Sequence, residues 1–418
     1  MNKVLYTSVA SLALTVGAAQ AEQVTVFGPW LGPDQEQVEQ VLEGFAEASG
    51  HDVSYVGSDS FEQQIVIDAE AGSAPNIAIF PQPGLAQDMA RNGFLTPLAD
   101  GTDDWVREHY AAGDSWVDLG SFAGPDGEDS LYGFFYKVDV KSLVWYMPEN
   151  FEDAGYEVPE TMEELKALTE QMAADGETPW CIGLGSGAAT GWPATDWVED
   201  LMLRVATPEE YDAWVSNDMP FDDPKVIEAI EEFGWFARND DFVNGGASAV
   251  ASTDFRDSPQ GVFSYPPECY MHRQASFIPT FFPEDADADF FYFPAYAERD
   301  LGSPVLGAGT LFAITSDAPV AHGLIAWLQT PIAHEVWMAQ SGFLTPYGAV
   351  NTELFATDTL RQMNQILLDA TTFRFDASDL MPGEIGAGAF WSGMVDYVTG
   401  EDAQSVAEGI QARWDEIN

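Results

Sequence analysis

Three tryptophans lie where the chain presents aromatic faces beside loops rich in glycine and proline. Trp192 belongs to the segment GWPATDW, Trp391 follows the run GEIGAGA, and Trp30 lies in the loop after the first expected strand. An indole face stacks on the apolar face of a sugar ring, while neighbouring acids such as Asp196 bind its hydroxyls. This pattern is more specific than any catalytic motif in the chain.

Tryptophan also fills hydrophobic cores, so each of these residues has a structural interpretation beside the functional one. The chain contains 13 Trp, and several of them must be core residues. Trp197 shares a helix face with Leu201, and we expect it in the core. For Trp192 both interpretations stay open, and Thr195 is expected to cap the helix that follows it.

Motifs for metal, nucleophilic and nucleotide chemistry are absent. The sequence has no HExxH, no Walker loop and no GxSxG elbow. The glycine-rich run 183–187 has Ala188 in place of the last glycine of a dinucleotide loop. The Asp-x-Asp-x-Asp run at 285–289 resembles the start of a calcium loop, but it lacks the glycine, and Tyr296 replaces the bidentate Glu. We therefore expect no metal and no cofactor.

Carboxylate pairs of the kind that hydrolyse glycosides have to be considered, because the chain contains 69 acidic residues. That number offers so many pairs that no single pair is evidence, and we assign no catalytic residue. Glu268, beside Cys269, is the acid most worth following, and a structural or ligand-bonding role is expected for it. A secreted glycoside hydrolase remains the alternative function.

The acidic composition excludes some partners. Fifteen basic residues face 69 acidic ones, which gives a net charge of −54. Such a field repels nucleic acid and anionic membranes, and we expect neither as a partner. A solvated acidic surface of this kind suits a salty medium.

Hydrophobic residues make up 46% of the chain, which is enough for two domains with cores of their own.

The amino terminus indicates export. Residues 1–21 read as a signal peptide, with Lys3, an apolar stretch over 4–16 and a small-residue cleavage site ending at Ala21. No cysteine follows this site directly, so we expect no lipid anchor. Cys181 and Cys269, the two cysteines of the chain, are expected to form one disulfide in an oxidising compartment. A catalytic thiol is the rival interpretation, but no cysteine-enzyme motif accompanies either cysteine.

Strands and helices alternate along the chain, which predicts α/β layers with parallel pairing. Strand-like segments at 23–27 and 76–80 precede helical ones, and residues 132–146 form a long extended run. Alternation in that run places Lys137, Asp139 and Lys141 on one face. No linker cuts the chain, so a second domain must be interwoven with the first.

One junction occurs twice. MARNGFLTP begins at Met89 and MAQSGFLTP at Met338. Each copy reads as a helix end, with Gly93 or Gly342 in the left-handed conformation and a proline that keeps the helix from resuming. A chain that uses the same junction twice is expected to have two related edges.

The ordered segments APNIAIFPQPG, YKVDVKSLVWY, GWPATDW, CYMHRQASFI, GAGTLFAITSDAP and MPGEIGAGAFWSGM carry a resemblance over essentially the whole mature chain. The chain resembles the extracellular solute-binding proteins of ABC transporters, in their oligosaccharide (maltose-type) group and closest to the alpha-glucoside-binding branch. The resemblance implies an α/β fold of two interwoven lobes joined by a multi-strand hinge. It divides the chain into an amino-terminal lobe of 22–137 plus 306–346 and a carboxy-terminal lobe of 138–305 plus 347–418.

The resemblance also implies a site and partners. Hinge crossings are expected at the YKVDVKSLVWY run, near 301–309 and near Pro346. The implied sugar contacts are Trp30, Asp34, Gln35, Ser58, Asp59, Gln82, Lys137, Trp192, Asp196, Tyr270 and Trp391. For Lys137, pairing with Asp139 is an equal interpretation.

The function implied is that of a monomeric periplasmic binding protein, not an enzyme. It would carry a neutral alpha-glucoside or related oligosaccharide to permease subunits driven by a cytoplasmic ATPase. Besides the hydrolase, a calcium-dependent adhesion module is a third option, and it predicts loss of fold or binding on chelation.

Overall fold

The computed structural model describes residues 21–110, 113–340, 342–369 and 372–417. The expected signal peptide therefore lies outside the described residues except for Ala21. Strands and helices alternate, and the α/β two-lobe fold expected from the sequence is confirmed. Within the described ranges, no helix combines the length and the apolar character needed to cross a membrane.

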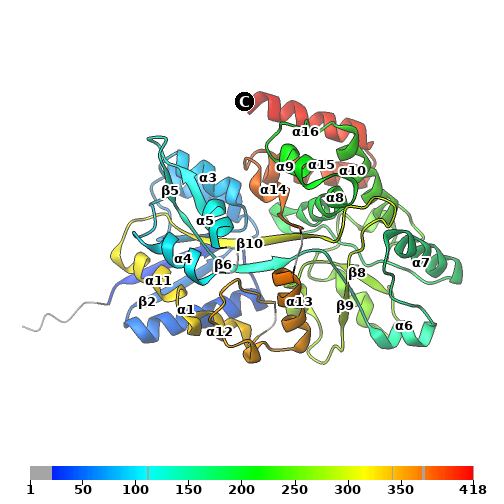
Figure 1. Cartoon of the computed structure of the whole chain (residues 1–418), viewed down its shortest axis with the longest axis horizontal. Helices are drawn as coiled ribbons and strands as arrows, with labels where there is room; N and C mark the ends of the chain where they lie inside the picture. Colours follow the sequence, from blue (N-terminus) through cyan, green and yellow to red (C-terminus); the bar gives the residue numbers. More distant parts are fainter. Residues whose placement is uncertain (1–20, 111–112, 341, 370–371, 418) are drawn as a thin grey trace, which may run out of the picture.

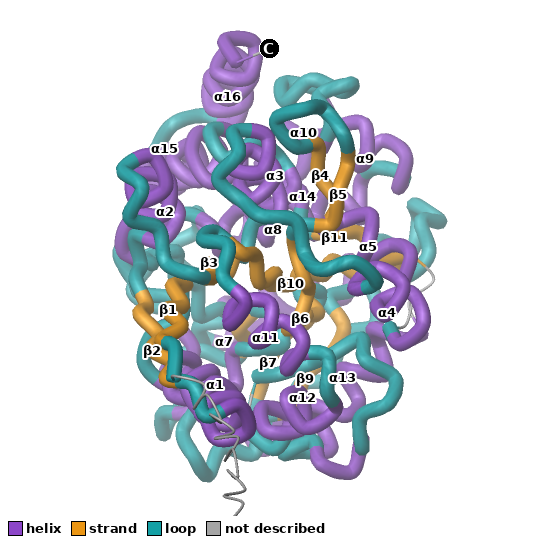
Figure 2. The backbone as a smooth tube through the Cα atoms, turned by 90° about the vertical axis from the view of Figure 1, so that its left-hand side faces the viewer, coloured by secondary structure: helices purple, strands orange, loops and turns teal. Residues whose placement is uncertain are grey.

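A six-stranded sheet organises the first lobe, in the order β11-β10-β3-β1-β2 with β6 also paired to β10. Its strands are β1 (Gln23–Gly28), β2 (Asp52–Gly57), β3 (Ile77–Phe80), β6 (Gly133–Val140), β10 (Pro304–Ile314) and β11 (Thr372–Phe375). Strand β1 runs parallel to β2 and β3, and Figure 2 shows these strands side by side. Because parallel strands end at the same edge, the loops after β1, β2 and β3 meet there.

Helices that pack on this sheet bury the first hydrophobic core. They are α1 (Pro33–Ser49), α2 (Phe61–Glu70), α3 (Pro83–Arg91), α4 (Thr102–His109), α5 (Gly113–Gly120), α11 (Pro319–Leu328), α12 (Pro331–Met338) and α13 (Asp358–Asp369). Helix α1 illustrates how these helices bury one face. Its large apolar residues recur at helical spacing, and all four are buried: Val38, Val41, Leu42 and Phe45. A small hairpin of β4 (Ser121–Ala123) and β5 (Asp129–Leu131) lies beside this core.

The second lobe has its own core around a three-stranded sheet in the order β8-β7-β9. The strands are β7 (Leu143–Tyr146), β8 (Met271–Arg273) and β9 (Asp289–Tyr292). The helices are α6 (Pro148–Ala154), α7 (Met162–Asp175), α8 (Trp192–Val205), α9 (Pro208–Val215), α10 (Pro224–Ala237), α14 (Ala377–Leu380), α15 (Trp391–Thr399) and α16 (Ala403–Ile417). Trp197 is 2% exposed in this core, as expected.

Long strands join the two lobes. In Figure 1, β6 and β10 run side by side across the middle of the molecule, and their residues pair antiparallel from Gly133 to Val140. Strand β10 contributes Leu306 to the second core and Leu311 to the first. A single strand that is buried in both cores ties the lobes together while leaving each lobe its own packing.

The third crossing falls later than the resemblance implied. After Pro346 the chain stays with the first core, where Leu360 and Met363 of α13 are buried. It enters the second core at Ala377, directly after β11. We keep the lobe division as a proposal, and within it we assign α13 to the amino-terminal lobe.

The repeated junction has the predicted backbone. Gly93 and Gly342 have φ values of +76° and +73°, a conformation that glycine adopts without strain. In the first copy, the amide of Phe94 donates to the Met89 carbonyl over 2.9 Å, which is the hydrogen bond of a Schellman ending. Met89 and Met338 are both buried in the first core, so both copies end helices of one lobe.

Cys181 and Cys269, 88 positions apart in the sequence, form a disulfide. Both cysteines are buried, beside Val262. A long closed loop restricts the unfolded chain, so the bond stabilises the fold chiefly by lowering the entropy of the unfolded state.

We expect the double substitution Cys181→Ser with Cys269→Ser to lower the free energy of unfolding by about 2–4 kcal/mol. Urea unfolding of the oxidised protein and of the variant measures this difference, and reduced wild-type protein is the matched control. Equal stability of all three samples would show that the bond does not restrain the unfolded chain.

Candidate functional site

A cavity of about 150 Å³ lies between the two lobes. Of the eleven residues predicted to contact a ligand, nine line it: Trp30, Asp34, Ser58, Asp59, Gln82, Lys137, Trp192, Asp196 and Trp391. The residues come from loops, helices and strands that are distant in sequence, and the fold gathers them at one place.

The amino-terminal lobe contributes the loops at the carboxyl edge of its sheet. Trp30 and Asp34 follow β1, Asp59 follows β2, and Gln82 follows β3. The Trp30 loop is fixed in place because its backbone amide donates to the hydroxyl of Tyr55 over 2.8 Å, and this hydroxyl donates to the Trp30 carbonyl. These side chains therefore form one wall of the cavity.

The carboxy-terminal lobe contributes the starts of α8 and α15. Trp192 begins α8 and Trp391 begins α15. Gly191 lies against the backbone of Trp391, and a β-carbon there would come within 2.3 Å of the Trp391 carbonyl oxygen. Its φ of +118° also favours glycine, so this residue allows the two tryptophans to lie together.

The expectation that Thr195 caps α8 is wrong. Pro193 fits the first turn of a helix, and α8 begins already at Trp192 with Gly191 as its cap. The Thr195 hydroxyl lies inside the helix and donates to the Trp192 carbonyl over 3.0 Å. The first turn of α8 therefore carries both Trp192 and Asp196 into the site.

Strands β6 and β10 form the floor of the cavity. Lys137, Asp139 and Lys141 all line it, as the alternation predicted, opposite Thr310 of β10. The Lys137 ammonium lies 3.1 Å from the Asp139 carboxylate, so Lys137 both faces the cavity and has an ion-pair partner. The two interpretations of this lysine are compatible.

Five buried polar atoms on the cavity lining lack a hydrogen-bond partner among the described residues. They are Asp34 Oδ1, Gln82 Oε1, Asp196 Oδ2, Thr310 Oγ1 and Trp391 Nε1. Each such atom costs about 1–3 kcal/mol when it is left unpaired in the interior. Their number in one cavity indicates a ligand whose polar groups supply the missing partners.

Aromatic rings form the remaining lining, from Trp30, Trp192, Trp391, Phe255 and Phe277. Trp192 meets Phe255 edge to face at 4.9 Å between ring centroids. Trp391 is 3% exposed but belongs to neither hydrophobic core. The Trp391 side chain is thus almost fully buried where it lines the cavity.

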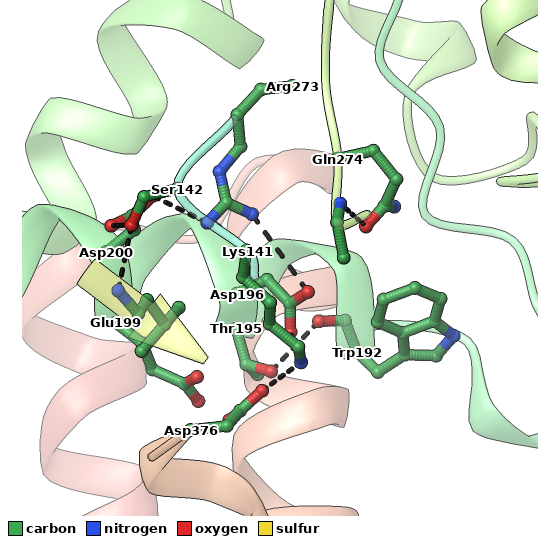
Figure 3. A network of polar contacts seen from close by, with 12 residues as sticks. Lys141, Ser142, Trp192, Thr195, Asp196, Glu199, Asp200, Arg273, Gln274 and Asp376 are labelled. Atoms are coloured by element: carbon green, nitrogen blue, oxygen red, sulfur yellow. Dashed lines mark hydrogen bonds and ion pairs between the residues drawn. The ribbon is translucent and has the colours of Figure 1, made fainter. Parts of the chain in front are cut away.

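Lys141 is the centre of a buried ionic network beneath the cavity (Figure 3). Its ammonium lies 2.8 Å from Asp196 Oδ1 and also pairs with Asp376. Burial alone would lower the pKa of Lys141, but the two carboxylates raise it well above its ordinary value. Burial raises the pKa of Asp196 to about 7, against the opposing effect of Lys141.

The network continues from α8 to the crossing strands. Asp200 pairs with Arg204 on its own helix and with Arg273 of β8, whose Nη2 lies 2.8 Å from Asp200 Oδ2. The Ser142 hydroxyl, between β6 and β7, donates to Asp200 Oδ1 over 2.7 Å. These bonds fix α8, and with it Trp192 and Asp196, to the strands that join the lobes.

Three carboxylates of this network come close together. Oxygens of Asp196, Glu199 and Asp376 lie within 4.8 Å of one another, a spacing that suits a cation. Lys141 already supplies the positive charge there through its pairs with Asp196 and Asp376. Burial raises the pKa of Glu199 well above its ordinary value, which further reduces the negative charge. We therefore interpret the group as an ion-pair network.

Two predicted residues do not line the cavity. The Gln35 side chain donates to Glu39 over 2.7 Å along the outer face of α1. Tyr270 lies in the second core, with its ring 5.4 Å from that of Tyr156. Gln35 follows Asp34 on a helix, so it cannot share the inward face, and Tyr270 is held by the strand next to the disulfide. We leave both out of the proposed ligand set.

The sequence did not identify several cavity residues: Glu62, Lys141, Phe255, Arg256, Phe277, Thr310 and Asp379. Lys141 had a signal, because it alternates with Lys137 on one strand face. Arg256 had a weaker signal in the scarcity of basic residues. The remaining residues carry no local pattern that separates them from core or surface positions.

Contacts between the lobes border the cavity. Arg256 Nη2 lies 3.2 Å from Asp59 Oδ1 across the lobes. On another side, the Gly383 amide donates to Asp88 of α3 over 3.1 Å. A β-carbon on Gly187 would come within 2.7 Å of Asp59, so the glycine-rich run 183–187 permits close approach of the lobes rather than nucleotide binding. The structure shows the lobes in contact around the site.

The fold and the site define a two-lobe protein with a polar, aromatic-lined cavity between its lobes. The chain belongs to the family of bacterial extracellular solute-binding proteins, which it matches over residues 29–335.

Relatives of known description cover almost the whole chain. The chain is 63% identical over 403 residues to the alpha-glucosides-binding periplasmic protein AglE of Rhizobium meliloti, covering 95% of this chain and 88% of the relative. It is 44% identical to the osmoprotective compounds-binding protein GgtB of a Synechocystis strain, covering 95% of this chain and 94% of the relative.

Solved structures share the fold at low sequence identity. The bacterial solute receptor AcbH matches with a TM-score of 0.81 and 17% identity, over 95% of this chain and 100% of the other. Maltose-bound MalE3 of T. maritima matches with a TM-score of 0.74 and 15% identity, over 95% and 100% of the two chains. Both comparisons support the two-lobe architecture.

Proposed function

We propose that this protein is the periplasmic substrate-binding component of an ABC sugar importer and binds a neutral alpha-glucoside or related oligosaccharide between its lobes. The observation that carries the proposal is the set of five unpartnered polar atoms in an aromatic-lined cavity. Sugar hydroxyls both donate and accept hydrogen bonds, so they match such a mixed set. The name of the relative AglE supports the choice of an alpha-glucoside.

The charges on the lining favour a neutral ligand over an anionic one. Six acidic residues line the cavity: Asp34, Asp59, Glu62, Asp139, Asp196 and Asp379. Only Lys137, Lys141 and Arg256 oppose them, and each of these is already paired with a carboxylate. No basic residue of the lining is left to meet a ligand carboxylate or phosphate.

Binding is coupled to closure in this proposal. A ligand that contacts both walls does so only when the lobes are shut, so it stabilises the closed form. The closed complex is recognised by permease subunits driven by a cytoplasmic ATPase, and the protein acts as a monomer in the periplasm after cleavage at Ala21. It performs no chemistry on the sugar.

Isothermal titration with maltose, sucrose, trehalose and glucosylglycerol tests the ligand class. We expect saturable binding of at least one of these sugars at one ligand per protein. Glucuronic acid is the charged control and is expected to give no heat. Absence of heat with all four neutral sugars would contradict the proposal.

Catalytic turnover distinguishes a glycoside hydrolase from a binding protein, because only the hydrolase releases glucose repeatedly. Incubation of the protein with the same sugars, followed by an assay for free glucose, is expected to show no release above a protein-free control. Steady release of glucose beyond one equivalent per protein would replace the transport function with hydrolysis.

A further inference from the structure

Two carboxyl side chains face the cavity from opposite lobes. Glu62 lies in the first turn of α2, in the amino-terminal lobe. Asp379 lies on α14, in the carboxy-terminal lobe. Both line the cavity and both are 7% exposed. Among the described residues neither carboxyl is in an ion pair, whereas Asp59, Asp139 and Asp196 of the lining are each paired with a cation. Asp34, the sixth acid of the lining, is also without an ion pair, and burial raises its pKa to about 6. It lies on the same lobe as Glu62 and is left unchanged in the variants below.

Their surroundings leave the two carboxyls facing the ligand space. Gln82 donates to Glu62, and the negative charge of Asp59 on the same lobe further raises the pKa of Glu62. Around Asp379 the charged groups are Asp376, Lys141, Asp196 and, across the cavity, Glu62.

Other charged groups on the neighbouring elements are engaged elsewhere. Asp88 of α3 accepts a hydrogen bond from the Gly383 amide, and Arg256 pairs with Asp59 and Asp254. Lys141 is divided between Asp196 and Asp376. The three cations of the cavity lining are therefore all paired with other carboxylates, and none is free to neutralise both Glu62 and Asp379.

We propose that Glu62 and Asp379 form a carboxyl pair that binds the hydroxyls of a neutral ligand from both lobes and takes up one proton when the lobes close. The inference rests on the proposed function, because it requires ligand-driven closure. With one of its two carboxyls protonated, the pair donates one hydrogen bond and accepts others, which matches a diol and rejects an anion.

The physical reason is the change of surroundings on closure. In separated lobes each carboxyl faces water and the other is distant, so both are ionised at neutral pH. Closure removes water and brings two like charges to one cavity, and both effects disfavour ionisation. In the closed structure burial raises the pKa of Glu62 to about 7 and the pKa of Asp379 well above its ordinary value.

The raised pKa values determine how ligand affinity changes with pH. A group whose pKa is higher in the closed form favours closure at low pH, and this contribution is lost as pH rises through the closed-form pKa. Ligand affinity should therefore fall as pH rises from 6 to 8. One proton taken up per ligand corresponds to a fall of up to about tenfold per pH unit.

Titration calorimetry of the full mature protein at pH 7, in phosphate and in Tris, measures the proton uptake. Maltose, sucrose, trehalose and glucosylglycerol are the probes, and the variants are Glu62→Gln, Asp379→Asn and the double variant. Gln and Asn imitate the neutral acids in shape. Glu70→Gln, an exposed position on the same helix α2, is the matched control.

We expect wild type and Glu70→Gln to take up about one proton more per ligand than the double variant, whose affinity depends less steeply on pH. If the double variant does not bind, the single variants decide, and each is expected to take up less than wild type. Equal uptake in wild type and variants would overturn this inference alone. Absence of binding by wild type to every sugar would overturn the proposed function and this inference with it.

Discussion

Replacing Lys141 by methionine is expected to destabilise the protein by about 3–5 kcal/mol, the largest loss of stability that we predict. Lys141 is 6% exposed and pairs with Asp196 and Asp376, which are buried beside it. Methionine keeps most of the side-chain volume but removes the charge. Two carboxylates then remain in the interior without their cation, and the desolvation that the ion pair offset becomes a net cost.

Urea unfolding of the Lys141→Met variant at pH 8 and at pH 5 measures the effect. The destabilisation should be smaller at pH 5, because protonation neutralises the carboxylates that Lys141 leaves behind. Lys225→Met is the matched control, since Lys225 pairs with Glu210 at the surface, where both side chains are more than a third exposed. Such surface pairs contribute about 0–1 kcal/mol. A similar small loss in both variants would show that the buried network does not stabilise the fold.

Replacing Trp391 by alanine is expected to weaken sugar binding at least about 30-fold, or about 2 kcal/mol. The indole lies on the cavity lining, belongs to neither core, and has an unpartnered Nε1. Its loss removes both a stacking face and a hydrogen-bond donor for the ligand. The melting temperature should change little by comparison, because Trp391 is a member of neither hydrophobic core.

Trp235→Ala is the control for this substitution. Trp235 packs at the edge of the second core, where Lys166 lies 5.0 Å from its ring centroid. It does not line the cavity, so its loss should lower the melting temperature and leave the affinity unchanged. Affinity and melting temperature are measured for both variants by calorimetry and thermal unfolding. Parallel losses of both quantities in Trp391→Ala would show that Trp391 acts as a core residue.

Local patterns predicted those parts of the site that depend on neighbouring residues in the chain. Alternation along one strand placed Lys137, Asp139 and Lys141 on one face, and all three line the cavity. The repeated helix ending at Gly93 and Gly342 has the predicted left-handed backbone. These predictions succeed because backbone conformation and side-chain direction follow from short-range sterics and hydrogen bonds.

Local patterns gave wrong predictions where packing between distant segments determines the start of a helix or the position of a side chain. Thr195 reads as a helix cap, but Gly191 and Pro193 start α8 earlier, and the close approach of Gly191 to Trp391 fixes that start. The resemblance placed Tyr270 near the ligand, whereas its ring packs against Tyr156 in the second core. The partner that holds Tyr270 comes from a segment more than 100 residues away, which no short pattern around Tyr270 records.

The sequence by itself determined the family, the alternating α/β elements and the disulfide partners, and its family resemblance named nine of the residues that line the cavity. Only the tertiary structure decided that Glu62 and Asp379 line one cavity and that Lys141 is shared by Asp196 and Asp376. It also placed the last crossing at β11 rather than near Pro346. The reason is physical: the electrostatic energy and the pKa of a charged side chain depend on the groups within a few ångströms of it. Those neighbours come from segments that only folding brings together.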